Sequence, residues 1–158
     1  EEIGMRGSRG GANTDANRRL AMLWGDGDTV RNPEGATYSS DKQIKTTVAD
    51  QMADENSLYN YYCRLIAIRH RYPAIARGSY TALSCGKDGF GGFLIEYEGE
   101  KLGLFHNTSN EEVTYDLSKC KALDGYTFTQ LCDAIGAGTA KLEGNMLTIG
   151  AYTSVVLR

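Results

Sequence analysis

Three charged side chains near the N-terminus are the residues best suited to contacting a polar ligand. Asp15, Arg18 and Arg19 lie in the stretch NTDANRRLAMLW, residues 13–24, whose polar half leads into an apolar half with the only tryptophan. A surface loop explains the polar half, and functional residues concentrate on such loops. An ion pair that fixes the loop is the alternative role for these charges, and the sequence does not rank the two arginines.

The adjacent carboxylates Glu1 and Glu2 do not form a catalytic pair. Acid–base cleavage by a carboxyl pair needs the two groups on either side of one bond, whereas neighbouring residues of an extended segment point to opposite sides. We therefore expect both glutamates to structure a loop.

The cysteines and histidines do not predict a metal site. The four cysteines contain no C-x-x-C pair, and the two histidines, His70 and His106, lie far from any cysteine cluster. A zinc site needs four such ligands at close spacing. We expect free, partly buried thiols, with Cys63 and Cys132 as inert packing residues.

Composition restricts the classes of partner. The 158 residues are 41% apolar and 23% charged, with a net charge of −3. A mildly acidic chain is not a general nucleic-acid binder, and no apolar run is long enough to cross a membrane. The chain opens on two glutamates rather than on a basic and apolar leader, which gives no visible signal peptide. Localisation, bacterial secreted or cytoplasmic, stays open.

Secondary-structure patterns divide the chain near residue 78. Residues 1–50 are rich in glycine and read as loops, whereas residues 54–72 repeat apolar side chains at helical spacing. Pro73 ends this predicted helix. The apolar stripe of the helix consists of Leu58, Tyr61, Leu65, Ile68 and Tyr72.

From residue 78 onward the apolar period becomes two. Seven or eight short strands are separated by turn signals, which is typical of an antiparallel sandwich or barrel. Most aromatic side chains in these strands alternate inward with apolar neighbours. Asn107-Thr108-Ser109 fits the glycosylation pattern, and we interpret it as a turn. The predicted core consists of Leu94, Leu104, Leu117, Leu131, Leu147, Val155 and Leu157.

Four segments, in this order, resemble the C-terminal third of the α-amylase family, glycoside hydrolase family 13. EEIGM at residues 1–5 is similar to the segment after the eighth barrel strand, and NTDANRRLAMLW to the next loop. SLYNYYCRLIAIRHRYPAIARGSY is similar to the last barrel helix, and YTSVVLR to the last strand of domain C. Leu20-Ala21 departs from the family, where proline often precedes the methionine.

The resemblance implies an α+β fragment. Residues 1–77 would be the loop after strand eight and the last helix of the catalytic (β/α)8 barrel, and residues 78–158 an antiparallel Greek-key β-sandwich, domain C. The family's nucleophile, acid/base and third aspartate all precede residue 1. No catalytic residue is therefore expected here, and the isolated chain should be inactive.

The resemblance also implies a function and partners. The parent would be a retaining enzyme that acts on α-1,4-glucans such as starch or maltodextrin, with Asp15, Arg18 and Arg19 touching glucose units. Trp24 would pack against the barrel rather than stack on a sugar. No cofactor is expected in this chain, and calcium is possible in the parent. The remaining barrel, or a second copy of the chain, would cover the helix.

Three alternatives stay open. The parent could be a glucanotransferase or an α-1,6-glucosidase, because the residues that distinguish these activities lie upstream. The strand-rich part could instead be a non-catalytic glycan-binding module, which exposed aromatic side chains on one sheet face would indicate. It could also be a purely structural module.

Overall fold

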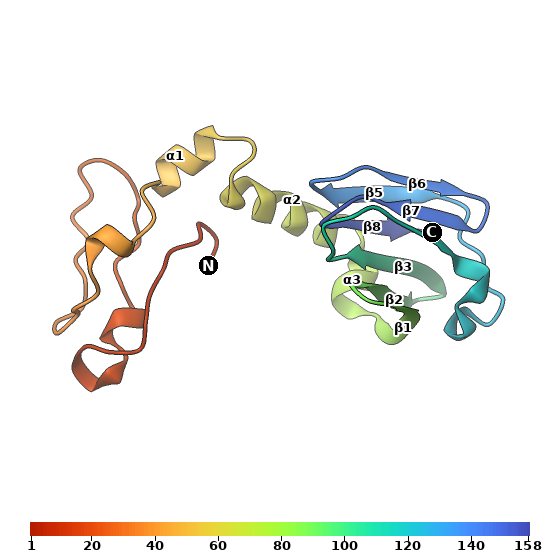
Figure 1. Ribbon diagram of the computed structural model, residues 1–158, viewed down its shortest axis with the longest axis horizontal. Coiled ribbons are helices and arrows are strands. Elements are labelled where there is room, and N and C mark those ends of the chain that lie inside the picture. The colour runs from red at the N-terminus through yellow and green to blue at the C-terminus, as the bar shows by residue number, and fades with distance from the viewer. The chain divides into compact units, whose positions relative to one another are not determined.

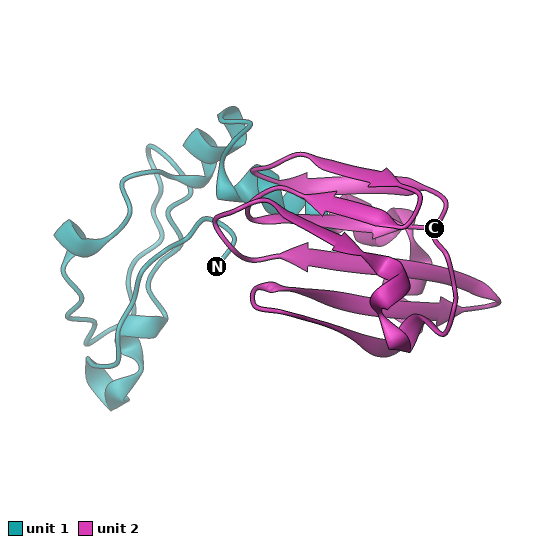
Figure 2. Ribbon diagram, turned by 45° about the vertical axis from the view of Figure 1, so that its right-hand side comes forward, with its two compact units in different colours: residues 1–65 teal, residues 66–158 magenta.

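A computed structural model describes residues 1–158, which form two compact units, Glu1–Leu65 and Ile66–Arg158 (Figures 1 and 2). The first unit is loop-rich and the second is mostly β-sheet. We expected a domain boundary between residues 77 and 78 because residues 1–77 resemble part of a catalytic barrel. The division into compact units after Leu65 does not test that assignment, so the boundary remains a prediction.

The first unit contains little regular structure, as its glycine-rich sequence indicates. Short 3₁₀ turns, η1 (Ala12–Thr14), η2 (Ala16–Arg18) and η3 (Ser40–Lys42), precede helix α1 (Val48–Ala53). The Thr47 side chain accepts from the Asp50 amide while the Asp50 carboxylate accepts from the Thr47 amide, so a complete capping box starts α1.

Helix α2 (Leu58–Arg71) is the predicted amphipathic helix, and it begins later than expected because Ser57 caps it. Pro73 does not merely end it but starts the next helix, α3 (Pro73–Arg77), at the position where proline costs least. Helix α2 contains no fully buried residue, and Leu58 is 40% exposed. Cys63 is exposed, so its interpretation as a buried packing residue was wrong: it lies off the apolar stripe of α2.

The second unit has eight antiparallel strands in two sheets (Figure 1). The strands are β1 (Ser79–Lys87), β2 (Phe90–Tyr97), β3 (Glu100–Asn107), β4 (Val113–Asp116), β5 (Leu131–Gly136), β6 (Ala140–Glu143), β7 (Met146–Ile149) and β8 (Thr153–Leu157). One sheet has the order β1-β2-β3-β8-β5 and the other β4-β7-β6. Between β4 and β5 the chain forms the 3₁₀ turns η4 (Leu117–Lys119) and η5 (Lys121–Leu123).

The main core is built from the inner faces of both sheets and from the η4–η5 segment. Five of the seven predicted core residues are buried there: Leu94, Leu117, Leu147, Val155 and Leu157. Leu104 is half-buried and packs against a different cluster, so that assignment was wrong, whereas Leu131 is half-buried and packs against this main core. Leu104 alternates with the buried Phe105 and therefore faces the other side of the sheet, and Leu131 lies at the start of edge strand β5.

A second, smaller core covers part of the outer face of the five-stranded sheet. Tyr72 and Ala74 from the helices pack on Ile95, Leu102 and Val156. Gly78 permits this contact, since a Cβ there would lie 2.5 Å from the Ile95 side chain. The end of α2 and all of α3 are thus part of the β-rich unit.

The two sheets are joined by one buried amide, Asn107, which is 2% exposed. Its Nδ2 donates to the carbonyls of Glu111, Ile149 and Gly150 at 2.7, 3.0 and 2.9 Å. An amide nitrogen so engaged is closed to glycosylation, which agrees with our interpretation of Asn107-Thr108-Ser109 as a turn.

Candidate functional site

The candidate ligand-contacting residues lie together in one turn of the first unit. Asp15 separates η1 from η2, Arg18 ends η2, and Arg19 follows it. Arg19 Nε donates to Asp15 Oδ2 at 2.5 Å. This hydrogen bond, together with the charge of Arg19, lowers the pKa of Asp15 and raises that of Arg19.

The ion pair between Asp15 and Arg19 matches the loop-fixing role considered for these charges, but it leaves much of both side chains exposed to solvent. The Arg19 side chain is 76% exposed and that of Asp15 39% exposed. Arg18 is also exposed, and its charge adds slightly to the lowered pKa of Asp15. The turn therefore presents two guanidinium groups and one partly engaged carboxylate to solvent.

A buried amide that sequence reasoning missed holds this turn in place. Asn17 is 4% exposed, and its Oδ1 accepts from the amides of Thr37 and Tyr38 at 2.7 and 3.0 Å. Its Nδ2 donates to Thr37 Oγ1 at 3.1 Å. The nearby glycines were the available signal: at Gly11 (φ +76°) a Cβ would lie 3.1 Å from Asn17 Oδ1.

A second buried amide, Gln51, ties the first residues of the chain to the helices. Its Nε2 donates to the Ile3 carbonyl at 2.8 Å, and its Oε1 accepts from the Tyr59 amide at 3.1 Å. Ile3 itself is 2% exposed. The EEIGM segment is therefore a fixed part of the unit.

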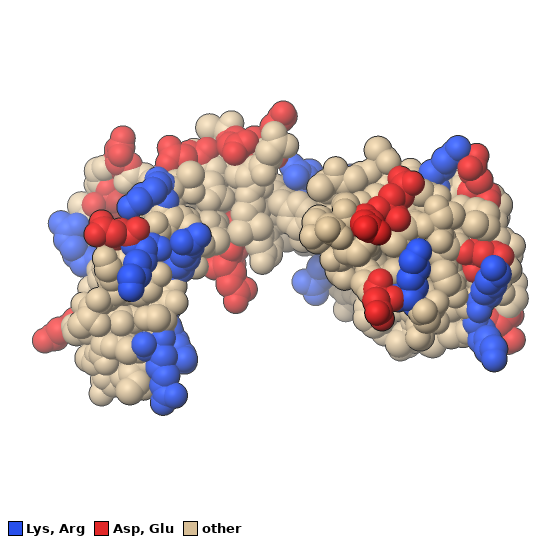
Figure 3. Space-filling view, in the orientation of Figure 1, with Lys and Arg blue, Asp and Glu red and all other residues tan.

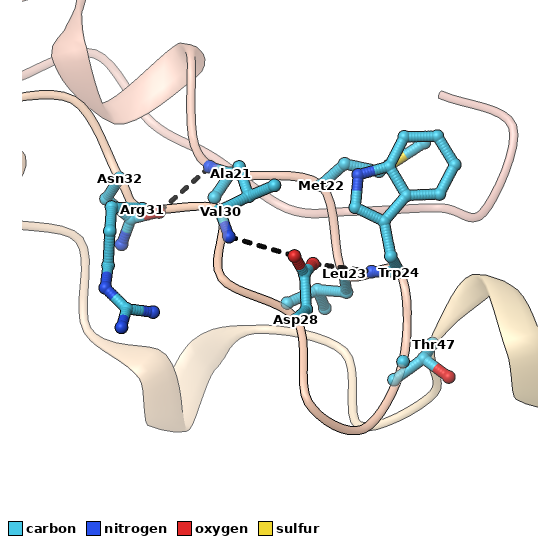
Figure 4. A pocket seen from close by; sticks show the side chains of 10 residues that line it. Ala21, Met22, Leu23, Trp24, Asp28, Val30, Arg31, Asn32 and Thr47 are labelled. Carbon is cyan, nitrogen blue, oxygen red and sulfur yellow. Dashed lines mark hydrogen bonds between the residues drawn. The ribbon is translucent and has the colours of Figure 1, made fainter.

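A hollow of about 340 Å³ lies beside Trp24 in the same unit (Figure 4). Asp28 shapes it, because its carboxylate accepts from the amides of Trp24 and Val30 at 3.3 and 2.9 Å. Asn32 closes the other end by accepting from the Ala21 amide at 2.9 Å. The ten lining residues come from Ala21–Asp28, Val30–Asn32 and Thr47.

The indole of Trp24 is 52% exposed in this chain, and its expected packing against the rest of the barrel remains a prediction. Its backbone, not its ring, is held: the Ala49 amide donates to the Trp24 carbonyl at 3.1 Å. The exposed indole and the Arg31 side chain both line this hollow, which therefore has an aromatic surface and a hydrogen-bond donor in its lining.

No group of three or more histidine, cysteine, aspartate or glutamate side chains is arranged to hold a metal ion. No helix has both the length and the apolar character needed to traverse a lipid bilayer.

Comparison with known proteins decides the family. The family described as Alpha-amylase SusG C-terminal domain matches residues 91–156, which run from β2 into β8. α-Amylase SusG of Bacteroides thetaiotaomicron is 31% identical over the whole chain. The chain belongs to the α-amylase family. Within this family, glycoside hydrolase family 13, it corresponds to the C-terminal portion.

Further relatives agree with this family assignment. α-Amylase 3 of Dictyoglomus thermophilum is 25% identical over the whole chain. An oligo-1,6-glucosidase of a Bacillus species is 30% identical over 53% of the chain and 17% of its own length. The chain spans 23% of SusG and 30% of α-amylase 3.

Solved structures carry the same fold. Amy13B of Eubacterium rectale superposes on 99% of the chain, and on 30% of its own, with a TM-score of 0.79 and 33% identity. The trehalulose synthase MutB of Pseudomonas mesoacidophila covers 89% of the chain, over 25% of its own, with a TM-score of 0.66 and 23% identity, which establishes the fold alone.

Proposed function

We propose that the chain is the C-terminal part of a retaining glycoside hydrolase that acts on α-1,4-glucans. The observation that carries this proposal is the match of the entire chain, loops included, to two proteins named α-amylase. The alignment with these two proteins covers both the loop-rich unit and the β-rich unit, which supports a shared role of both.

Residues 1–77 would supply the loop after the eighth barrel strand and the last barrel helix, and residues 78–158 the domain that supports the barrel. The poor burial of α2 supports this assignment, because its apolar side chains need a partner that the chain does not provide. The remaining barrel is the proposed partner, and a second copy would replace it when the chain is alone.

Asp15, Arg18 and Arg19 are proposed to contact the α-glucan. Their support is geometric: the turn is held rigidly by Asn17, while its charged groups stay exposed. Pre-positioned donors lose little entropy when they bind sugar hydroxyls. The glucanotransferase and α-1,6-glucosidase alternatives use the same turn and differ in residues upstream of Glu1. Calcium stays a proposal for the parent alone.

We do not expect a nucleic-acid or membrane partner. The net charge of −3 supports this, and Figure 3 shows basic and acidic side chains interspersed over the visible face of the β-rich unit rather than gathered by sign.

The test compares the isolated chain with the parent enzyme. We expect no reducing sugar from soluble starch with the isolated chain, and a several-fold rise in KM for maltooligosaccharides in the parent with Arg18→Ala or Arg19→Ala. Lys42→Ala, another exposed cation of this unit, is the control. Starch hydrolysis by the isolated chain would refute the proposal, and unchanged KM in both arginine variants would remove the turn from the substrate site.

One observation favours a glycan-binding role for the β-rich unit as a second candidate. Tyr80 and Phe93 are 47% and 38% exposed on the outer sheet face, with ring centroids 5.6 Å apart. Phe93 thereby departs from the inward alternation that we expected for most aromatic side chains. Their edge-to-face angle of 72° offers a corner rather than a flat stacking platform.

Retention on insoluble starch tests this second role. Phe93→Ala should abolish retention if the face binds glucan, whereas Tyr152→Asn, which alters a 58% exposed aromatic elsewhere, should not. Asparagine tolerates the positive φ of 49° at that position. No retention of the unaltered chain would leave a structural role for the module.

A further inference from the structure

Asn17 is the buried polar residue of the turn that carries the candidate ligand-contacting charges. It is 4% exposed, whereas the Arg19 side chain, two residues later, is 76% exposed. The Asn17 amide donates to the Gly10 carbonyl at 3.2 Å, and its carbonyl accepts from the Ser8 amide at 3.3 Å. The backbone of Asn17 therefore joins the turn to the segment that precedes it.

The side chain of Asn17 joins the turn to a third segment, which lies 20 residues further along the chain. Its Oδ1 accepts from the amides of Thr37 and Tyr38 at 2.7 and 3.0 Å, and its Nδ2 donates to Thr37 Oγ1 at 3.1 Å. The Ala12 amide adds a backbone contact by donating to the Gly35 carbonyl at 3.0 Å. Both ends of the side-chain amide are thus engaged with one segment, which holds its orientation.

Two glycines permit this close approach of the segments. Gly11 and Gly35 both have positive φ angles, +76° and +77°. A Cβ at Gly11 would lie 2.7 Å from the Gly35 carbonyl oxygen, and one at Gly35 would overlap the Ala12 side chain. The segment that receives the Asn17 side chain is therefore packed directly against the start of the turn.

The two arginines follow Asn17 directly in the chain. The Arg18 amide donates to the Asp15 carbonyl at 2.9 Å. The Arg19 amide donates to the Ala16 carbonyl at 3.1 Å, so both arginines belong to the same closed turn. Arg19 Nε also donates to Asp15 Oδ2 at 2.5 Å. The positions of all three charged groups thus depend on a turn that Asn17 attaches to the rest of the unit.

We propose that Asn17 is a positioning residue for glucan binding, because it holds this turn against the segment Gly35–Tyr38 and so sets where the charged side chains meet the sugar. The inference rests on the proposed contact between the turn and the α-glucan. Asn17 is buried and acts only through its charged neighbours. A displaced turn binds substrate and transition state less well by the same factor, so KM rises while kcat is retained.

The test measures the kinetics of the parent enzyme with maltooligosaccharides. Asn17→Ala should raise KM several-fold and leave kcat within about twofold. Asn17→Asp should restore most of the affinity, because a carboxylate still accepts from both amides and accepts from the Thr37 hydroxyl as well. Asn60→Ala is the matched control, since it removes a half-buried amide that donates to three carbonyl groups of residues 51–54 in the same unit. Its KM should not change.

Combined variants separate positioning from a general loss of stability. Once Arg18→Ala and Arg19→Ala are both present, adding Asn17→Ala should not raise KM further, because the groups that it positions are gone. A further rise of the same size as in the unaltered enzyme would overturn the proposal. Thr37→Val, which removes only the acceptor of Asn17 Nδ2, replaces Asn17→Ala if that variant does not fold, and it should raise KM to a smaller extent.

The outcomes distinguish this proposal from the proposed function. If the arginine variants raise KM and the Asn17 or Thr37 variant that folds does not, the positioning role is overturned and the substrate contact of the turn stands. If the arginine variants leave KM unchanged, the turn does not bind glucan, and both proposals fall. An equal rise in KM for Asn60→Ala would show that any loosening of the unit has this effect, which would also overturn the specific role of Asn17.

Discussion

The Tyr72 hydroxyl donates to Asp133 Oδ2 at 2.6 Å, and Arg71 Nη1 donates to Asp133 Oδ1 at 2.7 Å. Two consecutive residues at the end of α2 thus bind one carboxylate of β5, whose side chain is 17% exposed. Tyr72 also belongs to the outer core. This contact ties the C-terminal end of α2 to β5 within the β-rich unit.

Tyr72→Phe should lower the free energy of unfolding by about 1.5–3 kcal/mol, the usual value of a hydrogen bond to a charged group. The ring stays and only the hydroxyl is lost, so packing is unchanged. Urea denaturation measures the effect, and Tyr62→Phe, on the same helix, is the matched control. Equal stability of both variants would mean that Arg71 alone satisfies Asp133.

The same hydroxyl predicts a loss of stability in alkali. Burial, and then the hydrogen bond and charge of Asp133, raise the pKa of Tyr72 from 10.0 to about 12. The unfolded chain therefore releases this proton first, and stability falls as the pH rises from about 10 towards about 12. Between about pH 9 and about pH 11, the unaltered chain should lose about 1 kcal/mol more than Tyr72→Phe. Parallel losses in both proteins would contradict the assignment.

Asn107→Ala should cost about 3 kcal/mol, because it removes the buried side-chain donor to the carbonyl groups of Ile149 and Gly150. Asn107→Asp should cost more, since a carboxylate would face those oxygen atoms. Asn110→Ala, three residues away and exposed, is the control. Chemical denaturation gives the ranking, and an Asn107→Ala variant as stable as the control would show that water replaces the amide.

Leu102 and Leu104 provide a paired test of the helix cover on the outer sheet face. Both point to that face, but Leu102 is 0% exposed beneath the helices and Leu104 is half-buried. Leu102→Ala should cost about 2–5 kcal/mol and Leu104→Ala about 1 kcal/mol. Equal costs would mean that Leu104 is covered as well.

The isolated chain should self-associate. Several large apolar side chains are exposed, and exposed apolar surface favours association. Light scattering should report a species larger than the 17.3 kDa monomer, and Ile66→Glu should shift it towards the monomer. A monodisperse, unaltered monomer would count against the proposed barrel contact. These side chains are Trp24, Val30, Met52, Leu58 and Ile66.

The sequence predicts local order well where one face of an element is buried. Strict alternation located the strands, and helical spacing located α2. It assigned Leu104 to the wrong face because Leu102, Leu104 and the buried Phe105 form an apolar run in which alternation has no contrast. Leu102 is fully buried beneath the helices, whereas Leu104 stays half-buried. This difference comes from tertiary packing, which a sequence pattern does not show.

The charged residues of the candidate site could be predicted from the sequence, but the buried amides that hold its loops in place could not. Asp15, Arg18 and Arg19 stand out as charged groups in a loop, whereas Asn17 and Gln51 look like ordinary surface amides. Their burial follows from hydrogen bonds to residues distant in sequence, such as Thr37 and Ile3. Patterns of period two or 3.6 carry no information on such contacts.

The position of β8 affects how the protein is made. This strand pairs with β3 on one side and β5 on the other, so the five-stranded sheet lacks an interior member until Thr153–Leu157 has left the ribosome. During synthesis, β3 and β5 each expose an unpaired edge, which is a template for pairing with other nascent chains. Translation pauses before β8 should therefore lower the yield of soluble protein more than pauses placed after it.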